Sequence, residues 1–326
     1  MKILVTGGAG FIGSHLCEKL LQQHEVVCVD DVSTGSYRNQ YDAYKSPYYD
    51  FYKMDVTSKS FYETFKGMKD IKLIINLACP ASPVHYQKSP IKTFMTNILG
   101  AKNVLELAKK LNARVIQAST SEIYGDPLVH PQPEEYFGNV NTIGIRSCYD
   151  EGKRGAETLF SDYRRVYGVN TGIFRVFNTY GPKMAIDDGR VVSNFIVAAL
   201  QGRPHELYGG GLQTRSFCYV DDLVDGIIKF AFSDLSGPIN LGNPEEFTIA
   251  ELSGIILGMI GGNAIDKDAV SDDPKQRKPI IHKAKTLLDW EPKIPLRDGL
   301  LKTIEYFQEE LEWQQKQKVV MEHSGN

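Results

Sequence analysis

The stretch MKILVTGGAGFIG (residues 1–13) decides the fold. Its first six residues are mostly apolar, which is typical of a strand buried on both faces of a parallel sheet. Gly7, Gly10 and Gly13 follow, where a tight turn and a close approach of the backbone to a pyrophosphate require glycine. Residues 11–23 then show helical spacing. The N–H groups at the start of such a helix face the same phosphates, so this stretch predicts a dinucleotide site.

An acidic residue stands where a dinucleotide site needs one. Residues 25–29 form a second apolar strand, and Asp30 ends it, 17 residues after Gly13. A carboxylate there accepts the hydroxyls of the adenosine ribose and repels a 2′-phosphate, so NAD is favoured over NADP. Asp31 is its neighbour. The alternative interpretation, an aspartate in a turn at a strand end, does not explain the glycine spacing before it.

Strands and helices alternate over the first half of the chain, which predicts an α/β fold with a doubly wound parallel sheet. The expected strands end near 53–55, 77, 118 and 177, and the expected helices cover 91–111 and 149–167. Between them, 32–47 is a polar loop, and the two prolines of 78–83 should exclude a helix and hold an extended loop.

After residue 177 the elements become shorter and are joined by glycine-rich segments. We expect helices at 191–201, 221–232, 248–259 and 300–312, a strand and turn at 206–211, and a charged loop at 272–279. The predicted division is a Rossmann domain over 1–177, to which parts of 214–245 return, a substrate region over 178–312, and a frayed polar tail over 313–326.

The chemistry is predicted for the stretch from Gln117 to Lys153. Tyr149 and Lys153 are four residues apart on a helix, so they share one face, about 6 Å apart along the axis. An ammonium nearby should lower the pKa of the phenol, which then suits the removal of a proton from an alcohol. Thr120, after the fifth strand, could fix the same oxygen. A lone Tyr-x-x-x-Lys pair is common on amphipathic helices. Together with the glycine turn and Asp30 it predicts oxidation of a hydroxyl by a nicotinamide.

The overall composition excludes several other functions. The chain has 326 residues and a net charge of −3, so no basic footprint for nucleic acid is present. Its five cysteines are scattered and show no metal-binding spacing, which indicates a reducing compartment and no structural zinc. Strand-like residues begin at Lys2, which would leave no room for a signal peptide, and no apolar run approaches the length of a membrane span. The sequence therefore predicts a cytoplasmic protein without a metal.

The chain resembles the extended short-chain dehydrogenases/reductases that act on nucleotide sugars, and more narrowly the UDP-glucuronic acid decarboxylases. The resemblance extends to about residue 312. The motifs that carry it are GGAGFIGSHL (7–16), ACPASP (78–83), QASTSEIYGDP (117–127), HPQPEEYFGNVN (130–141), CYDEGKR (148–154), FNTYGPKM (177–184), DGRVVSNF (188–195), QTRSF (213–217) and NLGNPEE (240–246). Dehydratases of the superfamily usually carry Asp-Glu where Ser121-Glu122 stand here, and epimerases usually lack an acid at both positions.

This resemblance implies a reaction and a site. UDP-glucuronate would be oxidised at C4, lose CO₂ from the 4-keto intermediate and be reduced again, giving UDP-xylose with NAD regenerated. The implied catalytic residues are Thr120, Glu122, Tyr149, Lys153 and Arg215. The NAD-binding residues are Gly7, Gly10, Phe11, Ile12, Gly13, Asp30, Asp31, Thr34, Gly35, Asp55, Val56, Leu77, Thr96, Tyr149, Lys153 and Thr179. The substrate-binding residues are Ser121, Glu122, Asn178, Arg190, Val191, Tyr208, Gln213, Arg215 and Arg277. The resemblance also implies a homodimer through helices 91–111 and 149–167.

Glu122 and Arg215 would separate decarboxylation from simple oxidation. The resemblance gives Glu122 a role in proton transfer or orientation, and the substrate carboxylate should raise the pKa of Glu122. It gives Arg215 two roles, which are to bind the substrate carboxylate and to protonate C5. Arginine stays protonated, so we expect it to orient the group or a water. A phosphate contact to UDP is the alternative for Arg215. Arg277 would be the second phosphate-binding arginine. Two departures from the family pattern, Asp31 and Ile280, lie outside the catalytic set.

Three other functions remain open on sequence alone. An oxidative decarboxylase would release the 4-keto-pentose and NADH, and a UDP-sugar 4-epimerase would release no CO₂. A relative without catalysis, which senses NAD or acts as a scaffold, is disfavoured because Thr120, Tyr149 and Lys153 are all present.

Overall fold

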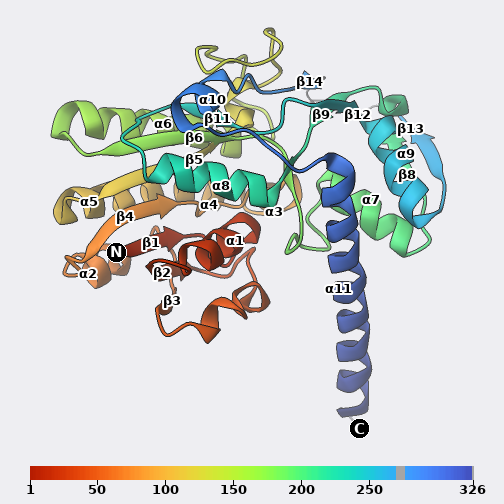
Figure 1. Cartoon of the computed structure of the whole chain (residues 1–326), viewed down its shortest axis with the longest axis horizontal. Coiled ribbons are helices and arrows are strands. Elements are labelled where there is room, and N and C mark those ends of the chain that lie inside the picture. Colours follow the sequence, from red (N-terminus) through yellow and green to blue (C-terminus); the bar gives the residue numbers. More distant parts are fainter. Residues whose placement is uncertain (269–275, 325–326) are drawn as a thin grey trace.

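A seven-stranded sheet organises the molecule, and all of its strands run parallel (Figure 1). The structure is a computed structural model that describes residues 1–268 and 276–324. The strand order is β11-β6-β5-β4-β1-β2-β3. The bounds are β1 Lys2–Thr6, β2 Glu25–Asp30, β3 Tyr49–Lys53, β4 Ile71–Asn76, β5 Arg114–Thr120, β6 Thr171–Val176 and β11 Ile239–Leu241. This order reverses next to β1 and is typical of a doubly wound sheet, which confirms the predicted fold class.

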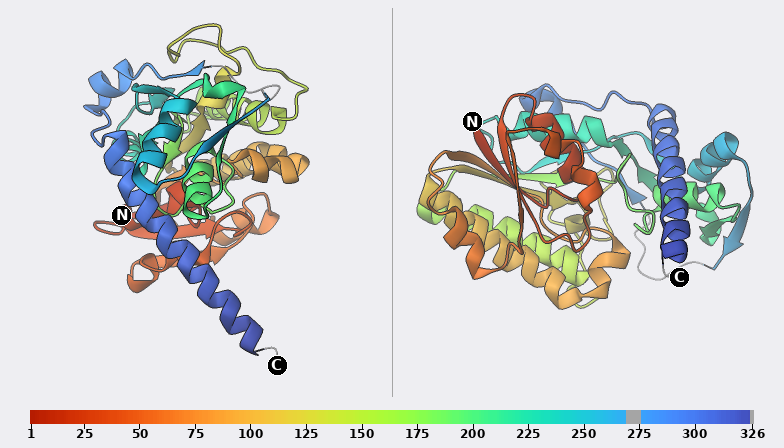
Figure 2. Two further views of the ribbon diagram at one scale, coloured as in Figure 1. Left: turned by 90° about the vertical axis from the view of Figure 1, so that its right-hand side faces the viewer. Right: turned by 90° about the horizontal axis from the view of Figure 1, so that it is seen from below.

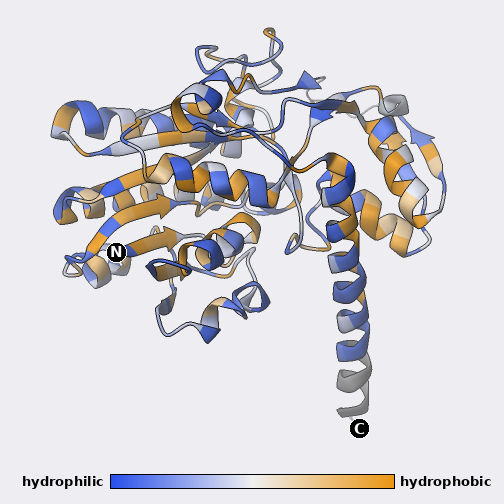
Figure 3. Ribbon diagram, viewed as in Figure 1, coloured by the Kyte–Doolittle hydropathy of each residue, from blue (hydrophilic) through white to orange (hydrophobic). Residues whose placement is uncertain are grey.

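Helices cover both faces of this sheet, as the views in Figure 2 show. One layer contains α1 (Phe11–Leu20) and α8 (Val220–Ala231), which pack against each other. The opposite layer contains α2 (Lys59–Phe65), α5 (Ala101–Leu111) and α6 (Ser147–Tyr167). The strands of the sheet centre are mostly hydrophobic in Figure 3, as expected for strands buried on both faces.

A smaller group of elements lies beside the carboxyl ends of the strands. It contains α7 (Val191–Leu200), α9 (Ile249–Ile260), the parallel pair β8 (His205–Tyr208) and β13 (Ala264–Lys267), and the sheet β12-β9-β14. In that sheet β9 is Thr214–Ser216, β12 is Glu246–Thr248 and β14 is Gln276–Arg277. The chain crosses between the two parts several times: β7 (Thr179–Tyr180) pairs with β10 (Cys218–Tyr219), and α10 (His282–Leu288) packs near β11.

The segment after β4 differs from the prediction in one respect, and the helix that follows it is irregular. A helix, α3 (Pro83–Lys88), begins at the second proline of the 78–83 segment, because proline is tolerated in the first turn of a helix, where its N–H would have no partner. The helix expected over 91–111 is present, but it is not a regular α-helix throughout. It consists of α4 (Pro90–Met95), a π-helical turn, η3 (Thr96–Gly100), and α5. Such turns widen a helix locally and occur frequently at functional sites.

The C-terminal helix is longer than predicted. It was expected to end at residue 312 before a frayed tail, but α11 runs from Leu296 to Ser324 and projects from the body in Figures 1 and 2. Polarity alone does not end a helix, and residues 313–323 contain neither glycine nor proline.

Residues 32–47, expected to be a loop, contain two short 3₁₀ turns, η1 (Tyr37–Gln40) and η2 (Ala43–Lys45). Of the predicted loop at 272–279, residues 272–275 lie outside the described residues.

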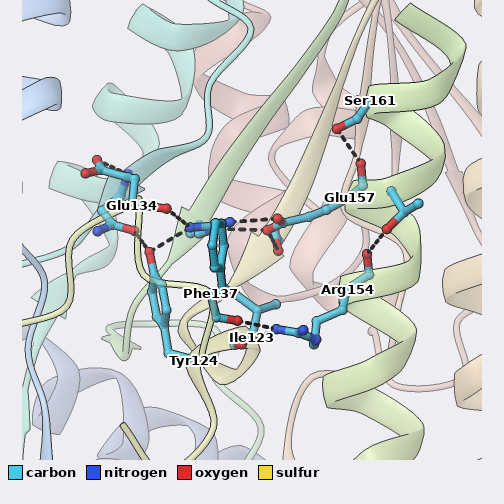
Figure 4. A network of polar contacts seen from close by, with 11 residues as sticks. Ile123, Tyr124, Glu134, Phe137, Arg154, Glu157 and Ser161 are labelled. Carbon is cyan, nitrogen blue, oxygen red and sulfur yellow. Dashed lines mark hydrogen bonds and ion pairs between the residues drawn. The ribbon is translucent and has the colours of Figure 1, made fainter. Parts of the chain in front are cut away.

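A buried ion pair fixes the loop between β5 and α6. Arg175 on β6 donates two hydrogen bonds to Glu157 on α6, of 2.9 and 2.8 Å. Its remaining nitrogen donates to the Tyr124 hydroxyl and to the carbonyl of Glu134, both at 2.9 Å. Figure 4 shows Tyr124, Glu134 and Glu157 gathered in this network. This guanidinium therefore links the loop that covers the strand ends both to α6 and to the sheet, and Asn240 on β11 adds hydrogen bonds to the same loop.

Replacing Glu157 by leucine should destabilise the fold by about 3–5 kcal/mol, because it leaves the charge of Arg175 buried without its partner. The matched control is Glu151→Leu on the same helix. Glu151 pairs with Arg154 at 3.4 Å in a more exposed position, so its loss should cost about 0–1 kcal/mol. Urea unfolding measures both. Equal losses would show that the buried pair is not the tie described above.

Candidate active site

One cavity of about 1060 Å³ opens at the carboxyl ends of the strands and extends to the smaller group of elements. Ligands bind at this edge in doubly wound folds, where the strand order reverses. All the predicted site residues line it. They are Gly7, Gly10, Phe11, Ile12, Gly13, Asp30, Asp31, Thr34, Gly35, Asp55, Val56, Leu77, Thr96, Thr120, Ser121, Glu122, Tyr149, Lys153, Asn178, Thr179, Arg190, Val191, Tyr208, Gln213, Arg215 and Arg277.

The glycine turn fits a dinucleotide. Gly7 has a φ of 73°, a backbone conformation that favours glycine. A Cβ atom at Gly13 would lie 2.1 Å from the carbonyl oxygen of Gly7, so a side chain there would push the turn apart. Asp30 accepts hydrogen bonds from the backbone N–H groups of Ala9 (2.9 Å) and Val32 (2.8 Å). These contacts hold the acid beside the turn, where ribose hydroxyls would reach it.

A basic residue missed by the sequence analysis stands beside this acid. Lys92, on α4, donates a hydrogen bond of 2.7 Å to Asp31 and lies 3.9 Å from Asp55. The side chain of Lys92 lines the cavity. Its partner Asp31 is 61 residues away in the chain, and no local pattern around Lys92 indicates the contact.

Tyr149 and Lys153 line the cavity from α6. The Nζ of Lys153 lies 5.8 Å from the centre of the Tyr149 ring and donates a hydrogen bond of 2.8 Å to the carbonyl of Ala118 on β5. Burial raises the pKa of Tyr149, and the hydrogen bond with Thr120 opposes that shift. Burial also lowers the pKa of Lys153. The predicted lowering of the Tyr149 pKa by Lys153 is therefore absent from the site as it stands.

Glu122 is held between two arginines. Arg277 donates a hydrogen bond of 2.6 Å to one of its carboxylate oxygens, and Arg146 donates to the other. Burial raises the pKa of Glu122, but Arg277 and Arg146 outweigh it and lower the pKa to about 2. The pKa of Glu122 was expected to be raised by the substrate. The two arginines instead lower it and keep this carboxylate ionised.

The two arginines expected at the substrate lie next to each other. Arg277 on β14 is in register with Arg215 on β9. Arg277 is almost fully buried and also donates to the Ser121 hydroxyl and the carbonyl of Gly125, at 3.1 and 2.9 Å. Arg215 donates to the carbonyl of Thr214 and adds to the positive field at Glu122. Arg277, which was expected at a phosphate of UDP, is therefore bound to the carboxylate of Glu122.

Two further residues of the cavity were missed. Arg146 precedes α6 by one residue and closes the pair with Glu122. Tyr86, on α3, stacks on the catalytic candidate Tyr149 with ring centres 5.0 Å apart and planes 6° apart. Stacking fixes the plane of the Tyr149 ring. No sequence signal points to Tyr86, since its position follows from a helix that the sequence analysis excluded.

Asp150 is a buried acid that follows Tyr149 in the sequence. One of its carboxylate oxygens has no hydrogen-bond partner among the described residues, and the other lies 3.9 Å from Arg146. Burial raises the pKa of Asp150, the charge of Glu122 raises it further, and Arg146 opposes them, with a resulting value of about 7. An unfolded aspartate has a pKa of about 3.9. Between about pH 4 and pH 7 the folded chain therefore holds a proton that the unfolded chain releases.

Asp150 should make the protein less stable as the pH rises through this range. We expect Asp150→Asn to gain roughly 2–4 kcal/mol relative to the unchanged chain between pH 4 and pH 8, because it removes the buried charge. Thermal unfolding at a series of pH values measures this. Asp162→Asn, an exposed acid on the same helix, is the control. A stability difference for Asp150→Asn that does not change with pH would contradict the shifted pKa.

Comparisons with known proteins agree with this geometry. The model of the NAD dependent epimerase/dehydratase family matches residues 3–242. The chain is 53% identical over 304 residues to UDP-glucuronic acid decarboxylase 6 of Arabidopsis thaliana, covering 92% of this chain and 87% of that protein. It is 50% identical to UDP-glucuronic acid decarboxylase 1 of Xenopus tropicalis, covering 96% and 73%.

Solved structures show the same architecture. A UDP-glucose 4-epimerase of Thermotoga maritima with UDP-glucose superposes with a TM-score of 0.88 at 30% identity, covering 95% of this chain and 100% of that one. A dTDP-glucose 4,6-dehydratase of Streptomyces venezuelae with NAD bound has a TM-score of 0.87 at 26% identity, covering 96% and 98%. Both share the Rossmann-like sheet and the smaller region beside it.

Proposed function

The chain belongs to the NAD dependent epimerase/dehydratase family, and we propose that it converts UDP-glucuronate to UDP-xylose and CO₂ with NAD as its cofactor. The observation that carries this proposal is the pairing of Glu122 with Arg277 in the same cavity as Tyr149, Thr120 and Lys153. The first three residues suit oxidation of a hydroxyl. The carboxylate–arginine pair adds groups that a decarboxylation can use, and relatives at about half identity are UDP-glucuronic acid decarboxylases.

Tyr149 acts as the base at the C4 hydroxyl of the sugar, and Thr120 holds the same oxygen. The residues of the glycine turn, with Asp30, would hold NAD, which would supply the acceptor and later the donor of the C4 hydride. The raised pKa of Tyr149 means that its phenol is protonated in the structure as it stands, so deprotonation requires additional positive charge close to the ring. Lys153 is positioned to contribute this charge and to hold the ribose, although its Nζ now donates to Ala118.

Loss of CO₂ follows from the position of the ketone. Once C4 is oxidised, it is β to the carboxylate on C5, so the electrons of the breaking C–C bond pass into an enolate. The hydroxyls of Tyr149 and Thr120 stabilise the developing oxyanion, since they stand where the charge accumulates. A proton then adds to C5, and C4 is reduced again. Atoms balance as UDP-xylose plus CO₂, with no net oxidation.

Glu122 and its arginines orient the substrate carboxylate and direct the proton to C5. An arginine that gripped this carboxylate tightly would stabilise the starting material and slow CO₂ loss. Glu122 instead neutralises the charge of Arg277, because the two side chains form an ion pair. Arg277 can therefore orient the substrate carboxylate by hydrogen bonding without binding it as an unpaired charge would. Arg215 completes the group from the neighbouring strand and either orients the carboxylate or contacts a phosphate of UDP.

The nucleotide end of the substrate lies over the smaller group of elements. Asn178 follows the end of β6, Arg190 and Val191 begin α7, and Tyr208 and Gln213 flank the turn after β8. Asp188 pairs with Arg190 through two hydrogen bonds, of 2.5 and 2.7 Å, and holds its guanidinium toward the cavity. We assign NAD binding to residues 1–177 together with the returning β11, and UDP-sugar binding to 178–312.

Incubation with UDP-glucuronate tests the proposal. We expect CO₂ and UDP-xylose in equal amounts without accumulation of NADH. Stoichiometric NADH with a keto sugar would identify an oxidative decarboxylase. A C4-epimerised UDP-uronate without CO₂ would identify an epimerase, and no turnover at all would indicate a binding protein.

Tyr149→Phe should lower the rate by about 10²–10⁴-fold, because it removes the base while keeping the ring that stacks on Tyr86. Glu122→Gln and Arg277→Met should retain C4 oxidation, seen as NADH absorbance, and lose CO₂ release. Single-turnover measurements separate the two steps. If the Glu122 and Arg277 variants lost only UDP affinity, their assignment to the decarboxylation step would be wrong.

We further propose that two copies pair through α4–α5 and α6. Apolar side chains are exposed along the first of these segments, which packs beside α6: Ile91, Phe94, Met95 and Leu99.

No helix of the described part of the chain is long and apolar enough to cross a membrane. The five cysteines form no disulfide in the structure, and this supports our assignment to the cytoplasm.

Light scattering should give a mass of twice 36.5 kDa. Ile91→Glu should shift it toward the monomer, because it places a charge in an apolar contact. Ile265→Glu, at an exposed position on β13, should not change it. A monomeric mass for the unchanged chain would rule out this pairing.

A further inference from the structure

The C-terminal helix α11 forms part of the wall of the cavity. Its residues Tyr306, Glu310, Trp313 and Gln314 line the cavity together with Arg38. Figures 1 and 2 show α11 leaving the smaller group of elements and passing beside the red and orange segments that carry the cofactor residues. No step of the proposed reaction uses this part of the helix, so its place beside the cavity needs another explanation.

Arg38 joins α11 to the first part of the chain. Its guanidinium lies 2.9 Å from a carboxylate oxygen of Glu310 and stacks over the Trp313 ring, 4.3 Å from the ring centre. The Glu310 side chain is only 11% exposed, so its charge is largely shielded from water and depends on this partner. Arg38 therefore forms both an ion pair and a cation–π contact with α11.

Arg38 belongs to the η1 turn, which rests directly on the glycine turn. The N–H of Ser36 and the side-chain amide of Asn39 both donate to the carbonyl of Ala9, at 3.1 Å each. The Gln40 amide donates to the carbonyl of Gly8 at 2.6 Å.

Residues 36–40 cannot move away from the glycine turn without breaking these hydrogen bonds. A Cβ atom at Gly35 would lie 2.7 Å from the Ala9 carbonyl, so the backbone there is also in close contact with the glycine turn. Thr34 and Gly35, expected to bind the cofactor, directly precede these contacts and line the cavity. The contacts run in series from α11 through Arg38 and η1 to the pyrophosphate end of the site.

We propose that α11 is a clamp on the cofactor loop, residues 33–40, and that it slows the release of NAD and NADH through Glu310 and Trp313. The reason rests on the proposed function. A protein that removes a hydride from C4 and returns it must keep the reduced cofactor until the sugar has lost CO₂. For a bound dinucleotide to leave past Thr34 and Gly35, the loop has to open, and opening it breaks the contacts of Arg38. Arg38 is in this sense a positioning residue.

The dissociation rate of NADH tests the clamp. The variants are Glu310→Gln, which removes the charge and keeps the shape, and Trp313→Leu, which removes the aromatic face. The purified protein is loaded with NADH, excess NAD is added, and the loss of bound-NADH fluorescence is followed. Each variant should release NADH roughly three- to tenfold faster. Glu309→Gln, an exposed acid one residue earlier on α11, should release it at the unchanged rate.

The outcomes separate the clamp from the proposed function. Equal NADH release from all four proteins would overturn the clamp. If Glu310→Gln and Trp313→Leu release NADH faster, the clamp stands, even if no protein forms CO₂ from UDP-glucuronate, in which case the proposed function fails alone. If both hold, the two variants should also divert part of the turnover to free NADH and a 4-keto-pentose.

Discussion

The hydrogen bond between Arg277 and Glu122 is the contact on which the site depends. The two residues are 155 positions apart, and their contact joins the strand β14 of the smaller group of elements to the end of β5 in the main sheet. Arg277 is almost fully buried, so its charge needs Glu122, and the pKa of Glu122 falls to about 2 because of Arg277 and Arg146. Neither residue can change its position alone, and the region expected to hold UDP is thereby fixed to the catalytic strand.

Burial shifts the pKa values of two catalytic candidates in the cavity. Burial raises the pKa of Tyr149 and lowers that of Lys153, so both side chains are pushed toward their neutral forms. A positive charge brought close to Tyr149 reverses this preference, because it stabilises the tyrosinate. Proton removal from the sugar is then tied to the presence of the oxidised cofactor. The stacked ring of Tyr86 keeps the phenol in its plane throughout.

Local spacing predicted the parts of the molecule that depend on near neighbours. The glycine turn, Asp30 and the Tyr149–Lys153 pair each follow from a short segment whose geometry is set by one element, and the parallel sheet follows from alternating strands and helices. The side chains that meet across the chain were not predictable. Arg146 reaches Glu122 from the end of a loop, and Lys92 meets Asp31 over 61 residues. Pro83 was taken as a barrier to a helix, although it starts one. The length of α11 was missed because polar residues were taken as a frayed end.

The central claim is that one hydrogen leaves C4 of the sugar and returns to the same molecule after CO₂ has gone. UDP-glucuronate labelled with deuterium at C4 tests it most directly. The account predicts that the UDP-xylose formed carries the deuterium at C4, even when excess unlabelled NADH is present in solution. Unlabelled UDP-xylose together with deuterium in free NADH would contradict it, because the hydride would then have left the protein before the sugar was reduced.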